Sequence, residues 1–373
     1  MPKGLAPGKE RLNMNVRILL VVGSFILSVA TGLILGRGGA ASAAPGSGAK
    51  LVVGLSLDTL KEARWQADRD LFVNRVHELG GEVIVLSANS DDTVQIGDVE
   101  KLITNKVDVL VVVPHDGTAM AKAVTMAHQA GIPVIAYDRL IKDSDLDMYV
   151  SFDNVRVGEL QAQFVVDQLK GKGKIVRIYG SKTDNNAAQF KQGQDNVLKP
   201  YIDRGDIQVV HEDWADDWKP ENAKRIMNAA ITSKGTAFDA VLASNDGTAG
   251  GAIQALTEEG LAGQKLVTGQ DAELVACQRI VAGTQAMSIY KPLKRLASSA
   301  AELAVKMGRR QVVVASQTTN NGKIAVPSLL NEVVTVTRTN MADTVVKDGF
   351  HSYDEVYRGV PVANRPSRAP AQP

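Results

Sequence analysis

The chain has 373 residues, of which 45% are hydrophobic and 22% charged, a composition typical of globular proteins and a length that suggests about two lobes. Its 42 basic and 41 acidic residues leave a formal charge of +1 and no basic excess to hold a phosphate backbone, so we expect no nucleic-acid partner. The single cysteine, Cys277, excludes an internal disulfide, and its apolar neighbours predict a buried thiol rather than a reactive one.

The amino-terminal segment has the order of an export signal. A basic stretch up to Arg17 precedes an apolar run at residues 18–36, and small residues follow, with Ala41-Ser42-Ala43 as a candidate cleavage site. The apolar run is also just long enough to span a bilayer, so a retained anchor is the alternative to a signal peptide at residues 1–43. Both alternatives place the rest of the chain outside the cytoplasm.

From Leu51 onward, short β-branched runs alternate with helical stretches, which predicts repeated strand–helix–strand units. The expected strands are 51–57, 83–86, 107–113, 134–137 and 148–152 in the first half, then 175–179, 207–210, 240–243, 266–268 and 286–290. Nearly continuous apolar strands indicate parallel sheets that are covered by helices on both faces. We therefore predict an α/β fold with two doubly wound parallel-sheet lobes.

Polar residues follow most of the expected strands, at the sheet edge where open α/β folds bind ligands. They are Asp58, Asn89, His115-Asp116, Asp138-Arg139, Asp153-Asn154, Asp184-Asn185-Asn186, Trp214 to Trp218, Asn245-Asp246, Gln270-Asp271 and Lys291. Asp and Asn at such positions also cap helices, so each of them taken singly is equally well explained as a cap. A helix cap does not explain Arg139 or Lys291, because the helix dipole disfavours cations at these positions. These two residues indicate a partner carboxylate or a ligand.

The three tryptophans lie in polar segments. Trp65 is flanked by Arg64 and Gln66, and an Ala-Asp-Asp segment separates Trp214 from Trp218. Aromatic faces beside guanidinium donors and carboxylate acceptors suit a sugar, whose C–H faces stack while its hydroxyls need both donors and acceptors. Two alternatives stay open. Trp65 shares helical spacing with core-type residues and could face the core, and either later tryptophan could brace a loop.

Catalytic and metal-binding signatures are absent from the sequence. It has no glycine-rich dinucleotide or phosphate loop and no nucleophile elbow, and its five histidines lack metal-ligand spacing. Asp143-x-Asp145-x-Asp147 begins like a calcium loop, yet Met148 stands where that loop needs glycine and Asn154 where it needs glutamate. We therefore expect a protein that is not an enzyme and has no cofactor and no metal ion.

A set of short segments, in order along residues 51–351, resembles the periplasmic D-xylose-binding proteins of bacterial sugar ABC transporters. The segments are Arg64-Trp65-Gln66-x-Asp68-Arg69-Asp70, Ala136-Tyr137-Asp138-Arg139, Ser151-Phe152-Asp153-Asn154, Asp184-Asn185-Asn186, Ala243-Ser244-Asn245-Asp246, Gly269-Gln270-Asp271-Ala272 and Tyr290-Lys291-Pro292. This resemblance implies the fold of a type I periplasmic binding protein, in which a three-stranded hinge joins two similar lobes and a monosaccharide occupies the cleft between them.

The resemblance also implies a division of the chain and a set of sugar-binding residues. Chain crossings near Asn154, Tyr290 and Val326 give a first lobe of residues 49–154 plus 292–326, a second lobe of 155–290 plus 327–355, and a disordered tail at 356–373. The sugar-binding residues would be Arg64, Asp138 and Arg139 from the first lobe, and Asp184, Asn186, Asn245, Asp271 and Lys291 from the second lobe or hinge. Trp65 and Trp218 would stack on the two faces of the sugar, with Trp214 as support. The sequence departs from the family pattern at His115-Asp116, on the rim of the cleft.

The balance of charges among these residues agrees with a neutral sugar. Three carboxylates and three cations suit a polyhydroxylated ligand better than a sugar phosphate or an acid. We expect a monomeric periplasmic protein that binds a monosaccharide, with D-xylose as the expected ligand, and delivers it to the permease and ATPase subunits of an ABC importer.

Two other classes of protein are alternatives to this one. The core of a sugar-responsive transcription regulator is one alternative, but it needs a helix-turn-helix where this chain has an export segment. An exported carbohydrate-active enzyme that uses Asp138 and Asp271 is the other. The neighbouring cations would keep both carboxylates ionised, whereas a general acid needs a raised pKa.

Overall fold

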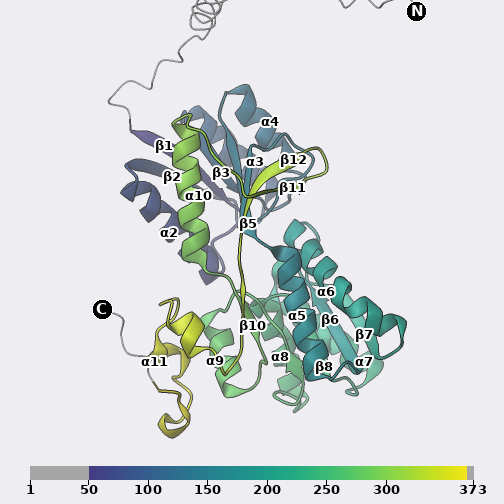
Figure 1. Ribbon diagram of the computed structural model, residues 1–373. Helices are drawn as coiled ribbons and strands as arrows, with labels where there is room; N and C mark the ends of the chain where they lie inside the picture. The colour runs from purple at the N-terminus through teal and green to yellow at the C-terminus, as the bar shows by residue number, and fades with distance from the viewer. Residues whose placement is uncertain (1–49, 368–373) are drawn as a thin grey trace, which may run out of the picture. The chain divides into compact units, whose positions relative to one another are not determined.

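Two parallel sheets organise residues 50–367, the part of the chain that the computed structural model describes (Figure 1). The expected signal peptide or anchor at residues 1–43 lies outside this range. The first sheet has seven strands in the order β11-β12-β5-β4-β3-β1-β2 and is parallel except for β11. Its strands are β1 (Leu51–Leu57), β2 (Gly81–Ser87), β3 (Val109–Val113), β4 (Val134–Tyr137), β5 (Met148–Phe152), β11 (Gln317–Asn320) and β12 (Ala325–Asn331).

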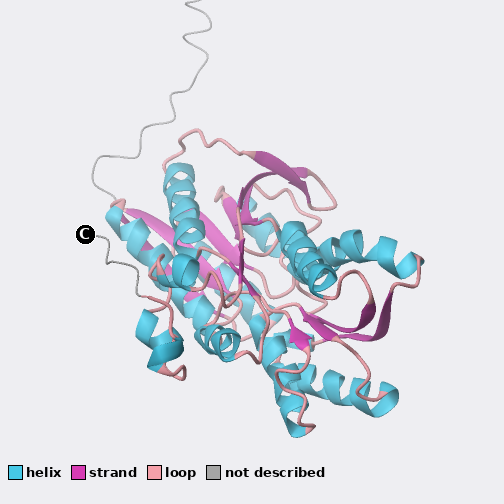
Figure 2. Cartoon of the chain, turned by 60° about the horizontal axis from the view of Figure 1, so that its bottom comes forward, coloured by secondary structure: helices cyan, strands magenta, loops and turns pink. Residues whose placement is uncertain are grey.

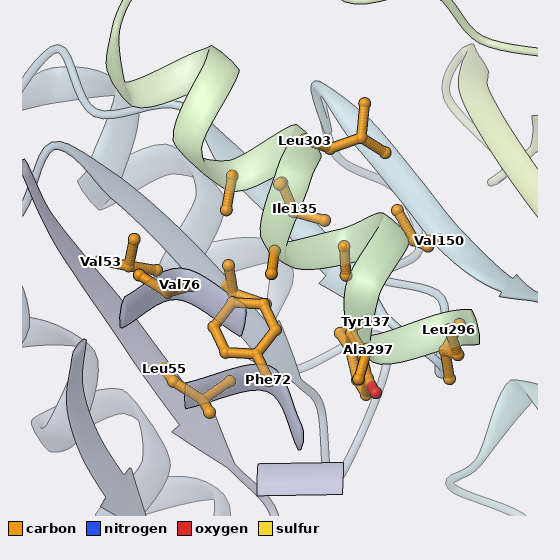
Figure 3. Close-up of a cluster of buried hydrophobic side chains, with 14 of the residues drawn as sticks. Val53, Leu55, Phe72, Val76, Ile135, Tyr137, Val150, Leu296, Ala297 and Leu303 are labelled. Carbon is orange, nitrogen blue, oxygen red and sulfur yellow. The ribbon is translucent and has the colours of Figure 1, made fainter. Parts of the chain in front are cut away.

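Helices cover both faces of the first sheet, because its central strands carry apolar side chains in both directions. On one face lie α2 (Ala63–Glu78) and α10 (Leu293–Gly308), and Figure 3 shows Phe72 of α2 and Leu296 of α10 near side chains of the buried strands. On the other face lie α3 (Asp92–Thr104) and α4 (Ala121–Gln129). We call this sheet with its four helices the first lobe.

The second sheet has four parallel strands in the order β7-β6-β8-β9. The helices α5 and α6 pack on one face and α7 and α8 on the other, so strands run between helices here too (Figure 2). An antiparallel pair, β10 with β13, continues this sheet through a bridge between Gln270 and Ile289. The strands are β6 (Gly173–Tyr179), β7 (Ile207–Trp214), β8 (Ala240–Ala243), β9 (Leu266–Val267), β10 (Ser288–Tyr290) and β13 (Val334–Val336). The helices are α5 (Asn154–Gln168), α6 (Asn185–Asp203), α7 (Pro220–Lys234), α8 (Asp246–Glu258) and α9 (Leu274–Ala282). We call this part of the chain the second lobe.

Three segments connect the two lobes (Figure 1). The first lies between β5 and α5, near Asn154, and the second between β10 and α10, just after Tyr290. The third lies after Asn331 rather than at Val326, because residues 328–331 of β12 still pair in register with residues 149–152 of β5. The α/β architecture expected from the sequence is confirmed, and the exact lobe boundaries stay a prediction.

The carboxyl-terminal region is ordered further than the sequence predicts. Residues from 356 were expected to form a tail, but α11 (Tyr353–Val356) and the residues after it fold onto α9. Val356, Tyr357 and Val360 are buried in one cluster with Cys277, whose thiol is buried as predicted. Apolar side chains spaced along 356–360 therefore belong to the core of the second lobe, and residues 368–373 lie outside the described part.

Within residues 50–367, no helix has the length and apolar character needed to cross a membrane. The candidate anchor at residues 18–36 does not belong to this range.

Candidate functional site

A single cleft, between the carboxyl ends of the strands of both lobes, brings together all ten residues singled out from the sequence. Its lining includes Arg64, Trp65, Asp138, Arg139, Asp184, Asn186, Trp218, Asn245, Asp271 and Lys291. Arg64 and Trp65 lie in the first turn of α2, and Asp138 and Arg139 directly follow β4. The others lie at the amino ends of α6 and α8 and after β7, β9 and β10. Residues more than 200 positions apart therefore share one polar surface, as expected for the strand-end edge of two parallel sheets.

Arg64 lies at the centre of a buried network that reaches both lobes. Its Nη2 donates to Asp138, its Nε lies 3.2 Å from Oδ2 of Asp68, and its Nη1 lies 3.3 Å from Oδ1 of Asp271 in the second lobe. Burial alone would lower the pKa of Arg64, but the three carboxylates hold it well above its usual value. Burial would likewise raise the pKa of Asp138, yet Arg64 and Lys291 keep it below its usual value. The pair of Arg64 with Asp138 therefore stays charged.

Arg139 forms a second bridge between the lobes. Its Nη1 donates to Oδ2 of Asp58 at 2.7 Å, and its Nε lies 2.9 Å from Oδ2 of Asp184 in the second lobe. Asp184 also serves as a cap, because its Oδ1 accepts from the backbone N–H of Asn186 at 2.9 Å at the start of α6. One carboxylate thus caps a helix and also lines the cleft. Asn245 is similar, since its side chain caps α8.

Trp65 lies between the core of the first lobe and the cleft. It belongs to the core cluster of the first lobe and also lines the cleft. The guanidinium carbon of Arg64 lies 4.3 Å from its ring centre and that of Arg139 lies 5.2 Å from it, at cation–π distance.

Trp218 lines the cleft from the second lobe. Its indole Nε1 donates to Oδ2 of Asp184 at 3.1 Å, and its ring meets Phe190 edge-on with centroids 6.2 Å apart. The backbone at residues 217 and 218 has φ values of 54° and 58°, a left-handed turn that brings the ring over Gly180. Trp214 lies outside this cleft and packs against Tyr179 instead, with ring centroids 4.9 Å apart and ring planes tilted by 42°.

Lys291 is a fully buried cation, with 1% of its side chain exposed. Its Nζ lies 3.6 Å from Oδ1 of Asp271 and within 5.5 Å of the ring centres of Phe152 and Phe190. Burial lowers the pKa of Lys291, and Asp271 and Asp138 offset part of that effect. The ammonium group thus presents N–H donors inside the cleft beside a carboxylate that accepts.

Several residues that line the cleft or support its walls were not predicted as site residues. Asp68 and Tyr137 lie behind Arg64, and the hydroxyl of Tyr137 donates to Asp68, whose pKa burial raises to about 6. The spacing of four residues between Arg64 and Asp68 in a helix was the available signal. Glu62, Phe190 and Glu273 also line the cleft, and nothing in the sequence distinguished them from surface or core residues.

The acidic turn that begins like a calcium loop is an ordinary surface feature. Asp145 pairs with Lys323 at 2.6 Å, and Asp147 pairs with His128 at 2.8 Å. Residues 50–367 hold no group of three or more His, Cys, Asp or Glu side chains placed to bind a metal ion.

The fold and the cleft define a two-lobed binding protein. A family model described as "Periplasmic binding protein domain" matches residues 53–310, and the chain belongs to this family, which consists of solute-binding receptors and not of enzymes. The chain is 49% identical over 304 residues to the D-xylose-binding periplasmic protein of Escherichia coli K12 and 48% identical over 307 residues to that of Haemophilus influenzae. Each match covers 82% of this chain and 92% of the relative.

Solved structures of solute-binding proteins share this fold. A carbohydrate transporter solute-binding protein from Chloroflexus aurantiacus, in complex with D-glucose, matches with a TM-score of 0.78 and 34% identity over 82% of this chain and 98% of its own. The family predicted from the sequence motifs is therefore confirmed: the chain is a member of the periplasmic binding proteins.

Proposed function

We propose that this protein captures a monosaccharide in the cleft, with D-xylose as the preferred ligand, and delivers it as a monomer to the permease and ATPase subunits of an ABC importer. The observation that carries the proposal is the pairing of buried cations and carboxylates from both lobes around one cleft with tryptophans on its walls. The names of the two curated relatives support D-xylose as the ligand.

The charge balance of the cleft favours a neutral polyol over a charged ligand. Arg64, Arg139 and Lys291 supply donors that are already matched by carboxylates of Asp138, Asp184 and Asp271. A sugar hydroxyl can accept from a cation and donate to its carboxylate partner at once, so it enters such a pair without leaving a buried charge unpaired. A phosphate or an acid would add an uncompensated charge, which is costly in a buried site.

Sugar binding can be coupled to closure of the lobes because the polar groups come from both. We propose the lobe division expected from the sequence, with the third crossing moved to the segment after Asn331. A sugar that contacts the first lobe through Arg64 and the second through Asp184 has more contacts when the lobes are closed, and it therefore shifts the equilibrium toward the closed form. A permease that distinguishes the closed form would receive loaded protein.

The test is calorimetric titration of the purified full-length chain with a panel of pentoses and hexoses. We expect D-xylose to bind about tenfold or more tightly than D-glucose, because a pocket shaped for a pentose must reject the extra hydroxymethyl group. No heat with any aldose would refute the binding function, and hydrolysis of xylosides would favour the enzyme alternative. Size-exclusion chromatography with light scattering checks the monomeric state.

The site itself is tested with Asp271→Asn. This change removes the negative charge beside Arg64 and Lys291 and one of the two acceptor oxygens but keeps the side-chain shape, and asparagine tolerates the φ of 93° at this position better than alanine does. We expect the affinity for D-xylose to fall by about 100-fold or more. The matched control is Asp203→Asn, which breaks only an exposed pair with Lys199. Equal affinity of the two variants would show that the site is misplaced.

A further inference from the structure

His115 occupies a defined position on the cleft wall for which the family resemblance gives no role. It follows β3, and its backbone N–H donates to Oε1 of Gln95 at 2.9 Å. Gln95 is fully buried and is held in turn by its bond to the carbonyl of Val113 at 2.8 Å. The imidazole lines the cleft with 13% of the side chain exposed, so a rigid backbone presents a titratable ring to the ligand space.

A line of alternating charges runs from His115 to the second lobe. Nδ1 of His115 lies 3.1 Å from Oδ1 of Asp58, Oδ2 of Asp58 accepts from Arg139 at 2.7 Å, and Nε of Arg139 lies 2.9 Å from Oδ2 of Asp184. Oδ1 of Asp58 is buried, and within residues 50–367 no group donates an aligned hydrogen bond to it. The strength of the contact between Asp58 and the imidazole therefore depends on whether the ring is protonated.

We infer that His115 is a positioning residue for Arg139, and that its protonated form favours closure of the lobes on the sugar. The inference rests on the proposed function. With His115 protonated, two cations balance the carboxylates of Asp58 and Asp184, and Arg139 can serve both lobes. When the proton leaves, Asp58 keeps Arg139 as its main counterion and draws the guanidinium toward the first lobe.

The direction of the pH effect follows from the groups around the ring. Asp58, after β1, and Asp92, at the start of α3, favour the protonated ring, whereas burial and Arg139 oppose it, and the pKa of His115 is raised overall. Asp116 is the next residue in the chain. Closure brings Asp184 onto Arg139 and neutralises part of the charge that opposes protonation. Closure should therefore take up a proton, and sugar affinity should fall as pH rises through the pKa of His115.

Other groups in the cleft or behind its wall also titrate near neutral pH, so the pH profile of wild-type affinity alone does not isolate His115. Burial raises the pKa of Asp68 to about 6 and that of Glu273 to about 7. The informative quantity is the difference in the pH dependence of sugar affinity between wild type and a His115 variant.

The experiment is calorimetric titration with D-xylose between pH 5.5 and 9, in pairs of buffers with different ionisation enthalpies. The proteins are wild type, His115→Asn, His115→Gln and the control His77→Asn, which alters an exposed histidine on α2. Over this range we expect the affinity of wild type and of the control to fall about threefold more than that of the His115 variants, which corresponds to a pKa rise of about 0.5 on closure. Proton uptake on binding should shrink in both His115 variants.

The outcomes separate this inference from the proposed function. If wild type binds no aldose at any pH, the proposed function fails and the inference fails with it. If sugar binds but the His115 variants keep the wild-type pH profile and proton uptake, the inference alone is refuted. If both variants fail to fold, NMR titration of the wild-type ring decides. A pKa of His115 that rises on addition of D-xylose supports the inference, and an unchanged pKa overturns it.

Discussion

Gly180 allows Trp218 to occupy its place in the cleft, and replacing it tests the stacking role of that ring. An alanine Cβ at position 180 would lie within 3.0 Å of Cη2, Cζ2 and Cζ3 of the indole, closer than real Cβ atoms approach, whereas ordinary contact begins at 3.4 Å. The ring would have to retreat, and its hydrogen bond to Asp184 and its edge contact with Phe190 would be disturbed with it.

The expected loss of affinity follows from what the ring contributes. An aromatic face against a ligand contributes about 0.5–1.5 kcal/mol beyond the area that it buries. With the lost burial added, we expect Gly180→Ala to weaken D-xylose binding by about 1–2 kcal/mol, or about 5- to 30-fold. The matched control is Gly97→Ala in α3, where a Cβ meets nothing within 4 Å and alanine should be neutral or slightly stabilising.

The assay is a double-mutant cycle measured by calorimetry with Gly180→Ala, Trp218→Ala and the double variant. If the methyl group acts only by displacing the indole, the double variant binds D-xylose as weakly as Trp218→Ala and no more weakly. Two results would contradict the reasoning. One is wild-type affinity in Gly180→Ala, and the other is fully additive losses in the double variant, which would mean that the methyl group acts on something other than the ring.

Three further changes test other parts of the structure. Asp68→Asn removes a charged partner of Nε of Arg64, so D-xylose affinity at pH 7.5 should fall about tenfold by calorimetry, and an unchanged value would show that Arg64 is held without it. Gly193→Ala places a Cβ against the carbonyl of Val155, where α5 and α6 touch, and should lower the melting temperature by about 5 °C or more while Gly97→Ala does not. Burial and Asp271 raise the pKa of Glu273 from 4.5 to about 7. The folded state thus binds this proton more tightly than the unfolded state, and the associated stability is lost as pH rises from 4.5 to 7. Glu273→Gln should therefore raise the melting temperature at pH 8 and leave it unchanged at pH 4. An equal change of melting temperature at both pH values would show that the raised pKa of Glu273 is not the cause.

The strands and the position of the cleft were predictable because each depends on local sequence. The β-branched runs that form β1, β4 and β5 have the bounds expected from the sequence. Polar residues after buried strands converge because parallel strands end at one edge of a sheet. This geometry places Arg139 and Asp184 together although they come from different lobes.

The features that escaped prediction depend on long-range contacts. β11 consists only of polar residues, Gln317 to Asn320, so no apolar run in the sequence predicts it. It pairs with β12, which joins the first sheet late in the chain. The packing of residues 356–360 on α9 needs a partner distant in sequence. Glu273 lines the cleft only because a turn after β9 directs it there.

The double use of Asp184 and Asn245 has a consequence for how sugar preference can change. Each side chain starts a helix of the second lobe while it lines the cleft, so replacing either one to admit a different sugar also removes a helix cap, at a cost of about 1 kcal/mol. Natural divergence or laboratory redesign of specificity at these two positions should therefore be limited to residues that also cap helices, such as Ser and Thr.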